Sequence, residues 1–576
     1  MTDRIIVLKF GSSVLGNRTD LLNAVHEIYR WYRDGWRVVA VVSAIGKTTE
    51  TLLSEARELS ERPNPQATAQ LLATGERHSA ALLGIALDRV GVPATVVDPR
   101  EIGMTVVGSA LDSELASVDR HRVQELLATA PVLVIPGFFA YDERGQLHLL
   151  GRGGSDLSAV FLARALQARC RLIKDVDGVY ERDPATTAAT GLRRFVSLGY
   201  ADALLRAKQL VQPKAVHFIE QHGASVEVAS AASGYESTIG RCECTLVDAS
   251  SNRPLSVLIL GLGTVGLGVY QRLASLPDHF RVIGALVRDR ARHGAHGVPM
   301  NMLHDSVEAL SGLQPDVVVD ALPGLQPSQA LARYYLAHGI AVVTANKALI
   351  ATVGVELSEL AARAGTSIRA SAAVGGSTPM LEFIHRHSAA GPGAITSIAG
   401  VLNGTCNYVL DQCIAGADFA SAVHTAQAHG FAEADPSDDL LGRDTSRKLQ
   451  ILARRAFGQP LDSVEIEPLN ATTLHTKIGA LREGARLRAI ARATLRDGRI
   501  VGRIQLEQVA ADDGFAGVSD EWNRLQVTLA SGADSAVTGR GAGRWPTTEA
   551  MLADLFGLWR CDSTALKTSA PRAGHN

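Results

Sequence analysis

The chain has few cysteines and no long apolar run. Six cysteines are scattered over 576 residues, which excludes a disulfide framework and a four-cysteine zinc site. The formal net charge of -2 gives no basis for binding nucleic acid or an acidic membrane surface. No run is long enough to span a bilayer, and the first residues lack the apolar core of a signal peptide. We therefore expect a cytoplasmic, reduced protein that acts on small molecules, without nucleic-acid or membrane partners.

Apolar, β-branched runs alternate with amphipathic stretches along most of the sequence. This alternation predicts an α/β fold with mainly parallel sheets. The first half supplies predicted strands at Ile5–Leu8, Val38–Val42, Val132–Ile135 and Leu172–Ile173, and predicted helices at Leu21–Trp31 and Leu115–Leu127. A second series of predicted strands runs through Val257–Leu260, Val282–Leu286, Val317–Val319 and Ala341–Val343.

A polar segment that ends in proline, Val247–Pro254, separates the two series. We expect a first domain over residues 1–246, a linker over 247–254, a second α/β domain over 255–390 and a further domain over 391–566. The last part of that further domain is expected to return to the second one. Residues 567–576 are expected to be disordered.

A glycine-rich turn follows the apolar run that opens the second series. In Gly261-Leu262-Gly263-Thr264-Val265-Gly266, the first glycine allows a tight turn, the second admits a pyrophosphate and the third allows helix–strand packing. The helix that follows directs its N-terminus at the phosphates. Glycines also end strands in proteins that bind no nucleotide, but a strand before and a helix after favour a dinucleotide site.

The cofactor that this turn predicts is NADPH, with NADH as the alternative. The next predicted strand ends in Val287-Arg288-Asp289-Arg290, and an arginine there favours the 2′-phosphate of NADP. Arg288 is the expected phosphate contact. The alternative is that Arg288 and Arg290 form a solvated loop with Asp289.

Several polar and charged residues further along the chain lie at positions where ligands bind in α/β folds. Asn346 and Lys347 follow a predicted strand, whose carboxyl end faces the ligand crevice. Asp444 and Lys448 are four residues apart and share one face of a helix that begins near Leu441. An exposed ion pair is the alternative, but the acids that precede them would repel one another unless they bind a cation.

The second half resembles homoserine dehydrogenase from about residue 255 to 560. The resemblance depends on Asn403-Gly404-Thr405-Cys406-Asn407-Tyr408, on Glu433-Ala434-Asp435-Pro436 and on the Asp444–Lys448 spacing. It implies a Rossmann domain, a substrate and dimerisation domain, and NAD(P)H-dependent reduction of L-aspartate 4-semialdehyde to L-homoserine. The family's site residues would be Lys347, Lys448, Asp444, Glu433, Asp439 and Thr405, with Gly541 near the cofactor.

A different glycine-rich pattern lies in the first half. Lys9-Phe10-Gly11-Ser12-Ser13 places a lysine beside a tight turn at a strand end, which suits a phosphate, although a surface lysine is the alternative. Arg152 of Gly151-Arg152-Gly153-Gly154-Ser155-Asp156 can bind a carboxylate. The loop Asp175-Val176-Asp177-Gly178-Val179-Tyr180 can face ATP and Mg²⁺.

Together with Gly75-Glu76, these residues resemble the amino acid kinase family, and within it aspartokinase, over about residues 1 to 240. The resemblance implies phosphorylation of the L-aspartate side chain by MgATP. Lys9 would stabilise the transferring phosphoryl group, while Glu76, Arg152 and Asp156 would hold the substrate. The residues expected near ATP are Lys9, Gly11, Ser12, Lys174, Asp175, Tyr180 and Arg182.

The chain departs from both families at several positions. Ser12 replaces a glycine and Lys174 a threonine in the kinase half, so a non-catalytic scaffold or a kinase for glutamate or N-acetylglutamate are the alternatives. Ser371 stands where the dehydrogenase family often has glutamate, beside a turn where the resemblance implies Na⁺ or K⁺ near Val374. Arg540 replaces a proline, and we expect it to contact cofactor phosphate.

The resemblance also predicts how the halves are assembled. Fused enzymes of this kind usually carry small regulatory ACT domains between the halves, and the stretch before Val257 is too short for one. We therefore expect no ACT-mediated feedback by threonine or lysine. A homo-oligomer, dimer or tetramer, is implied by the dehydrogenase resemblance alone.

Overall fold

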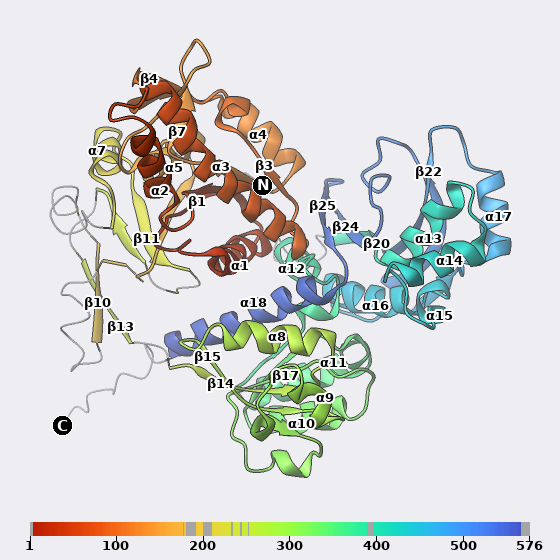
Figure 1. Cartoon of the computed structure of the whole chain (residues 1–576). Coiled ribbons are helices and arrows are strands. Elements are labelled where there is room, and N and C mark those ends of the chain that lie inside the picture. Colours follow the sequence, from red (N-terminus) through yellow and green to blue (C-terminus); the bar gives the residue numbers. More distant parts are fainter. Residues whose placement is uncertain are drawn as a thin grey trace. The chain divides into compact units, whose positions relative to one another are not determined.

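The computed structural model describes residues 4–176, 178–179, 192–197, 199, 210–231, 234, 236–241, 245–250, 253–388 and 395–565. The chain forms two compact units, one of residues 1–252 with 560–576 and one of residues 253–559 (Figure 1). Of the helices among the described residues, none combines the length and the apolar character that crossing a membrane requires. Tyr180, Arg182 and the tail 567–576 lie outside the described residues.

The first unit is built on a mainly parallel sheet with the strand order β12-β11-β9-β1-β2-β6-β3. Helices α4, α5 and α7 cover one face of it and bury apolar side chains of alternate strand positions, among them Val7 and Val39. Its strands are β1 (Ile5–Phe10), β2 (Arg37–Val42), β3 (Ala94–Val96), β6 (Val132–Pro136), β9 (Arg169–Lys174), β11 (Val226–Ser230) and β12 (Ser237–Ile239). Its helices are α1 (Leu21–Arg33), α2 (Thr48–Leu59), α3 (Pro65–Arg89), α4 (Arg120–Thr129), α5 (Gly154–Leu166) and α7 (Pro213–Gln221).

Two small sheets complete this unit. One has the order β5-β4-β7-β8, with β4 (Thr105–Ser109), β5 (Asp112–Ser117), β7 (Phe139–Tyr141) and β8 (Leu147–Leu149). The other pairs β10 (Leu192–Ser197) with β13 (Thr245–Ser250) in antiparallel register. Residues 247–250 of the segment expected to be a linker therefore lie in a strand.

The predicted helix at Leu115–Leu127 is wrong at its start. Residues 112–117 form β5, which is paired with β4, and the helix begins only at Arg120. The reason is the cap: the Asp119 side chain accepts a hydrogen bond from the Arg122 backbone N–H at 3.0 Å, which fixes the first turn there. The other predicted strands and Leu21–Trp31 coincide with β1, β2, β6, β9 and α1.

The second unit begins with a parallel sheet of order β16-β15-β14-β17-β18-β19. All six residues of its central strand β14 are buried, as expected for a strand covered on both faces. The strands are β14 (Leu255–Leu260), β15 (Phe280–Leu286), β16 (Leu303–His304), β17 (Val317–Asp320), β18 (Ala341–Thr344) and β19 (Ile368–Arg369). The helices between them are α8 (Thr264–Ala274), α9 (Arg290–Gly294), α10 (Ser328–Ala337) and α11 (Lys347–Arg363).

The rest of the second unit is a sheet of order β21-β23-β22-β20-β24-β25 with helices packed against it. Its strands are β20 (Ile395–Val401), β21 (Ser463–Ile466), β22 (Arg486–Arg496), β23 (Arg499–Val509), β24 (Trp522–Leu529) and β25 (Asp534–Arg540). Its helices are α12 (Met380–Ser388), α13 (Gly404–Ile414), α14 (Phe419–Ala428), α15 (Ser437–Leu440), α16 (Arg443–Phe457) and α17 (Ala471–Gly479). The long helix α18 (Arg544–Ala565) then runs back alongside α8 (Figure 1).

Candidate active sites

The glycine turn after β14 has the geometry of a dinucleotide site. Gly261 has a φ of +91°, and a Cβ at Gly266 would lie 1.9 Å from the Gly261 carbonyl oxygen, so both positions require glycine. A Cβ at Gly263, by contrast, would meet no atom within 4 Å. The open space at Gly263, the N-cap of α8, leaves room for a pyrophosphate at the helix N-terminus, where Thr264 and Val265 begin the helix.

Arg288 is exposed at the end of β15, beside this turn. Its neighbours are engaged elsewhere: Asp289 caps α9 by accepting from the Arg292 N–H at 3.0 Å, and Arg290 donates to the Met300 carbonyl at 3.2 Å. Among the described residues, Arg288 alone of the three has no bond to the protein. All three side chains are exposed, so the arrangement is compatible with both the phosphate contact and the solvated loop.

Asn346 caps α11 and fixes the loop after β17. Its side-chain oxygen accepts from the Leu349 N–H at 3.1 Å, and its side-chain nitrogen donates to the Gly324 carbonyl at 2.6 Å. Asn346, expected near the cofactor, therefore holds two loops at the carboxyl edge of the sheet. Lys347, the next residue, is the first of α11.

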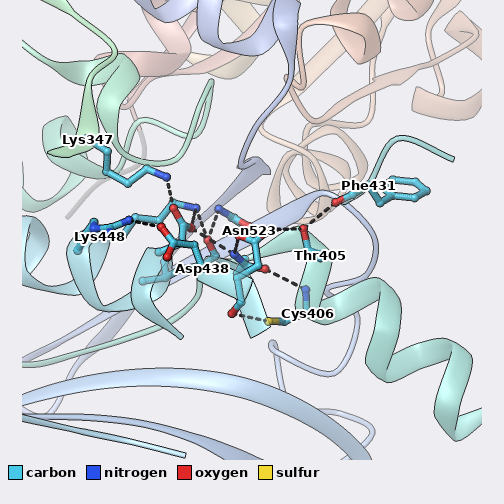
Figure 2. Close-up of polar contacts among 12 residues, drawn as sticks. Lys347, Thr405, Cys406, Phe431, Asp438, Lys448 and Asn523 are labelled. Atoms are coloured by element: carbon cyan, nitrogen blue, oxygen red, sulfur yellow. Dashed lines mark hydrogen bonds and ion pairs between the residues drawn. The ribbon is translucent and has the colours of Figure 1, made fainter. Parts of the chain in front are cut away.

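Lys347 and Lys448 converge on one carboxylate, that of Asp444 (Figure 2). Lys448 Nζ lies 3.0 Å from Asp444 Oδ2 and 2.5 Å from the Leu402 carbonyl oxygen, while Lys347 forms an ion pair with Asp444 Oδ1. The Lys448 and Asp444 side chains are 7% and 11% exposed. The pair on α16 is thus a buried part of a cluster and not an exposed surface ion pair.

The charges of this cluster shift one another's protonation. Burial alone would raise the pKa of Asp444, but the ammonium groups of Lys448 and Lys347 hold it well below its ordinary value. The pKa of Lys347 is lowered, first by burial and then by the like charge of Lys448, with Asp444 opposing both. The carboxylate therefore stays ionised and keeps both ammonium groups aimed at one point.

Asp439 forms the second acidic position of the cluster. The Asn403 side-chain nitrogen donates to Asp439 Oδ1 at 2.7 Å and to Asp444 Oδ2 at 3.2 Å, and so bridges the two carboxylates. The Thr405 hydroxyl lies 3.0 Å from Asp439 Oδ2 and 2.6 Å from the Phe431 carbonyl oxygen (Figure 2). Asp439 and Thr405, both expected at the site, are therefore brought together with the lysines.

Glu433 is the expected dehydrogenase residue that this cluster does not include. It is exposed in the segment after α14, where its backbone carbonyl accepts from Gln427 at 3.1 Å. Sequence reasoning missed Asn403, which caps α13, and Asn523, whose side-chain nitrogen donates to Leu402 at 3.2 Å. A capping asparagine at the start of the NGT run is the signal that could have identified Asn403.

The turn around Val374 packs against the Gly541 turn. A Cβ at Gly376 would lie 2.8 Å from the Arg540 carbonyl oxygen and 3.0 Å from the Gly541 carbonyl carbon. Arg540 itself forms an ion pair with Glu521 at 3.2 Å. The Ser371 hydroxyl lies 2.9 Å from an Asp554 carboxylate oxygen.

In the part of the chain that the structure describes, no group of three or more His, Cys, Asp or Glu side chains is placed to hold a metal ion.

In the first unit, Lys9 and Lys174 share the Asp156 carboxylate. Lys9 lies near the end of β1 and Lys174 ends β9, the strand that pairs with it. Their Nζ atoms lie 2.7 Å and 3.3 Å from Asp156, which is in the first turn of α5. All three side chains are less than 10% exposed. A Cβ at residue 11 would lie 2.7 Å from Lys9 Nζ and would displace the end of that side chain.

Burial shifts the ionisation of this site. It would raise the pKa of Asp156, but the two lysines hold that pKa below its ordinary value. It lowers the pKa of Lys174 to about 8, together with the like charge of Lys9. It raises the pKa of Glu76, on α3, to about 8. Glu76 Oε2 is buried and has no hydrogen-bond partner among the described residues.

Three other residues expected at the kinase site are exposed. Ser12 follows β1, Asp175 follows β9, and Arg152 lies in the glycine-rich turn before α5. All three are therefore at the carboxyl ends of the central strands or at the start of the helix that covers them. Tyr180 and Arg182, expected near ATP, fall outside the described ranges.

Comparisons with known proteins divide the chain in the same order. The family model of the homoserine dehydrogenase NAD-binding domain matches residues 261–371, and that of homoserine dehydrogenase matches 379–556. The amino acid kinase family model matches residues 4–230.

Individual relatives agree with this division. A homoserine dehydrogenase of Synechocystis is 33% identical over 52% of this chain and 72% of its own length. An aspartokinase of a Bacillus species is 34% identical over 42% of this chain, which spans 59% of that protein. The crystal structure of a homoserine dehydrogenase from Thiobacillus denitrificans matches 55% of this chain and 76% of its own, with 30% identity and a TM-score of 0.51. The chain therefore belongs to the homoserine dehydrogenase family through its second half and carries a domain of the amino acid kinase family in its first.

Proposed function

We propose that this chain is a bifunctional cytoplasmic enzyme that phosphorylates L-aspartate with MgATP and reduces L-aspartate 4-semialdehyde to L-homoserine with NADPH. The observation that supports the second activity most directly is the convergence of Lys347 and Lys448 on Asp444, with Lys347 at the carboxyl edge of the sheet that carries the dinucleotide-type turn. The parallel support for the first is the buried Lys9–Asp156–Lys174 group at the carboxyl edge of the first sheet.

The dehydrogenase chemistry needs a positive charge at the aldehyde oxygen. Gly261–Gly266 would hold the cofactor, which would supply the hydride for the aldehyde carbon, so that negative charge would develop on the aldehyde oxygen. The Lys448 ammonium, held by Asp444 and the Leu402 carbonyl, stabilises that charge and donates the proton that completes the hydroxyl. Lys347 adds a second positive charge from α11, and Asp439 binds the substrate's ammonium group.

The preference for NADPH is tested at Arg288, whose guanidinium is available for the 2′-phosphate. In an Arg288→Ser variant we expect the KM for NADPH to rise about tenfold or more, with the KM for NADH unchanged. An exposed arginine elsewhere in the unit, Arg499, provides the matched control as Arg499→Ser. Equal KM values for NADPH in both variants would exclude Arg288 as the phosphate contact.

The kinase chemistry needs charge neutralisation and positioning. Lys9 stabilises the transferring phosphoryl group, and exposed Arg152 binds a substrate carboxylate bidentately. Buried Glu76 accepts the substrate's ammonium group, which would supply the partner that its Oε2 lacks and would favour its ionised form. Magnesium would be held by ATP and by Asp175.

The first experiment is hydroxylamine trapping of the acyl phosphate formed from ATP and L-aspartate, alongside homoserine oxidation in the same preparation. We expect both activities, with the first lost in Lys9→Ala and the second in Lys448→Met. Trapping with glutamate or N-acetylglutamate instead would assign another acidic substrate to the kinase half. Homoserine oxidation without any trapped product would leave a non-catalytic scaffold, an alternative that Ser12 and Lys174 motivate.

Two further features of this proposal rest on the family alone. A monovalent cation, Na⁺ or K⁺, would lie near Val374, in the turn packed against Gly541. A homo-oligomer would form, as a dimer or a tetramer. Dehydrogenase rates measured in Na⁺, K⁺ and a large organic cation, and the mass of the protein in solution, test these two points.

A further inference from the structure

Among the residues that the structure describes, the kinase site holds more buried positive charge than its acids balance. Lys9 and Lys174 lie on neighbouring parallel strands, and their ammonium groups share the carboxylate of Asp156. The backbone N–H of Gln212 also donates to Asp156, at 3.4 Å. One carboxylate therefore faces two ammonium groups in a region where each is less than 10% exposed.

The other described acids near these lysines do not restore this charge balance. Glu76 is buried on α3, and because burial raises its pKa to about 8, it carries little charge at neutral pH. Asp175 follows Lys174 but is exposed, so solvent weakens its field. An uncompensated buried cation is costly, and such a site gains stability by binding an anion.

We propose that Lys174 is a second phosphate-binding residue, which contacts the transferring phosphoryl group of ATP together with Lys9, while Asp156 positions both ammonium groups. This inference rests on the proposed kinase function. It assigns to Asp156 a role different from holding the substrate, since both of its carboxylate oxygens face lysines. It also explains why a charged side chain is tolerated at the end of β9.

The transfer itself needs no proton from either lysine. A carboxylate oxygen of aspartate forms a bond to the γ-phosphorus, and the bond from that phosphorus to the bridging oxygen breaks. The electron pair of that bond stays on ADP, whose oxygen becomes anionic. The two ammonium groups stabilise the charge on the equatorial and bridging oxygens during the exchange, and magnesium carried by ATP would add to that stabilisation.

The test compares Lys174→Met, which removes the charge, with Lys174→Arg, which keeps it. We expect kcat/KM for ATP to fall about 10²-fold in the first variant and less than about tenfold in the second. Arg169→Met removes a cation from the other end of β9, where Arg169 pairs with Glu227 at 2.6 Å, and should leave kcat/KM for ATP unchanged. The thermal midpoint of the unit that holds the kinase site, measured for each variant, reports whether that unit has folded. Equal kcat/KM in wild type and Lys174→Met would overturn the inference.

The pH profile separates a charge at the phosphate from a structural role. With the pKa of Lys174 at about 8, kcat/KM for ATP in the wild type should fall as pH rises through that value. Lys9, Asp156, Asp175 and Glu76 face the same region, and Glu76 titrates in the same range. In Lys174→Arg the guanidinium stays charged and Glu76 is unchanged, so the fall should move to higher pH. An unmoved fall would assign it to another group and contradict the inference.

If the wild-type protein forms no acyl phosphate, the proposed kinase function is refuted, but the phosphate contact of Lys174 is still open to a separate test. Calorimetric titration of the full chain with MgATP then decides. An affinity lowered about tenfold or more in Lys174→Met but not in Arg169→Met would support the phosphate contact. Equal affinities would exclude it.

Discussion

At the residue scale, the buried carboxyl group of Glu76 should lower the free energy of unfolding, although the proposed kinase site needs it. Its carboxyl keeps a proton up to about pH 8 in the folded chain but loses it near pH 4.5 when unfolded. Between these values the unfolded state binds fewer protons, so stability falls as pH rises. We expect Glu76→Gln to raise the free energy of unfolding by on the order of 2–4 kcal/mol at pH 8, with little effect at pH 4.5, and to abolish aspartate phosphorylation.

The thermal midpoint of the first unfolding transition, at both pH values, measures this effect. Exposed Glu61 provides the control as Glu61→Gln, which should move neither the midpoint nor the activity. A midpoint that is lower in Glu76→Gln at pH 8 would show that the carboxylate is stabilised in the fold, contrary to this account.

Asp444 should set the pH range of the dehydrogenase through Lys347. Its carboxylate raises the pKa of Lys347, against burial and the charge of Lys448. In Asp444→Asn that support is lost, so Lys347 loses its proton at a lower pH. We expect the alkaline limb of kcat to move to lower pH and kcat at neutral pH to fall about 10²-fold or more. Asp462→Asn, at a carboxylate away from the cluster, should change neither, and an unmoved limb in Asp444→Asn would contradict the coupling.

The residues of the dehydrogenase site could be predicted only where they belong to a recognisable sequence motif. Lys347 and Asp444 are far apart in sequence, and the resemblance alone placed them in one site. Asn403 was missed because a capping asparagine usually serves its own helix, and here it also bridges two carboxylates. Glu433 shows the opposite case. Its motif matches that of the family, but its side chain is exposed and lies outside the cluster.

At the element scale, α16 is held between two glycines in left-handed backbone conformation. Gly442 precedes it with φ +72° and Gly458 follows it with φ +75°. A Cβ at Gly442 would lie 2.7 Å from Ile466 Cγ2, whereas one at Gly458 would meet nothing within 4 Å. The two positions therefore share the backbone cost of alanine, about 1–2 kcal/mol, but only Gly442 adds a clash with β21.

This pair gives a matched prediction. Gly458→Ala should lower stability by about 1 kcal/mol and leave the dehydrogenase rate intact. Gly442→Ala should destabilise more and lower kcat, because the clash displaces the turn that carries Asp444. Denaturant unfolding and homoserine oxidation measure both. Equal effects of the two substitutions on kcat would show that the start of α16 does not position the carboxylate.

Buried parallel strands were the elements that the sequence predicted best. A strand such as β14 is buried along its whole length, so its apolar run has few interpretations. The β4–β5 hairpin was missed because its residues are largely exposed and their pattern also fits an amphipathic helix. The Asp119 cap, a local hydrogen bond, marks where the helix begins.

At the scale of the whole molecule, each proposed site is built within one compact unit. The two proposed reactions are also not consecutive, because an acyl phosphate must first be reduced to an aldehyde before the proposed second reaction can use it. We therefore expect Lys9→Ala to lose kinase activity with the dehydrogenase rate unchanged within about twofold, and Lys448→Met to do the reverse. Steady-state rates of both reactions in both variants measure this. A large loss of the second activity in either variant would reveal coupling between the sites.

The return of α18 has a consequence for biosynthesis. Phe556 is 1% exposed and its ring packs on Phe280 of β15, with centroids 4.9 Å apart, while Arg544 donates to Gln271 of α8 at 2.7 Å. More than 250 residues are translated between Phe280 and Phe556. During translation, the aromatic face of the cofactor domain therefore stays uncovered until α18 has been synthesised. We expect nascent chains stalled before α18 to depend on chaperones, and those stalled after it to be released from them.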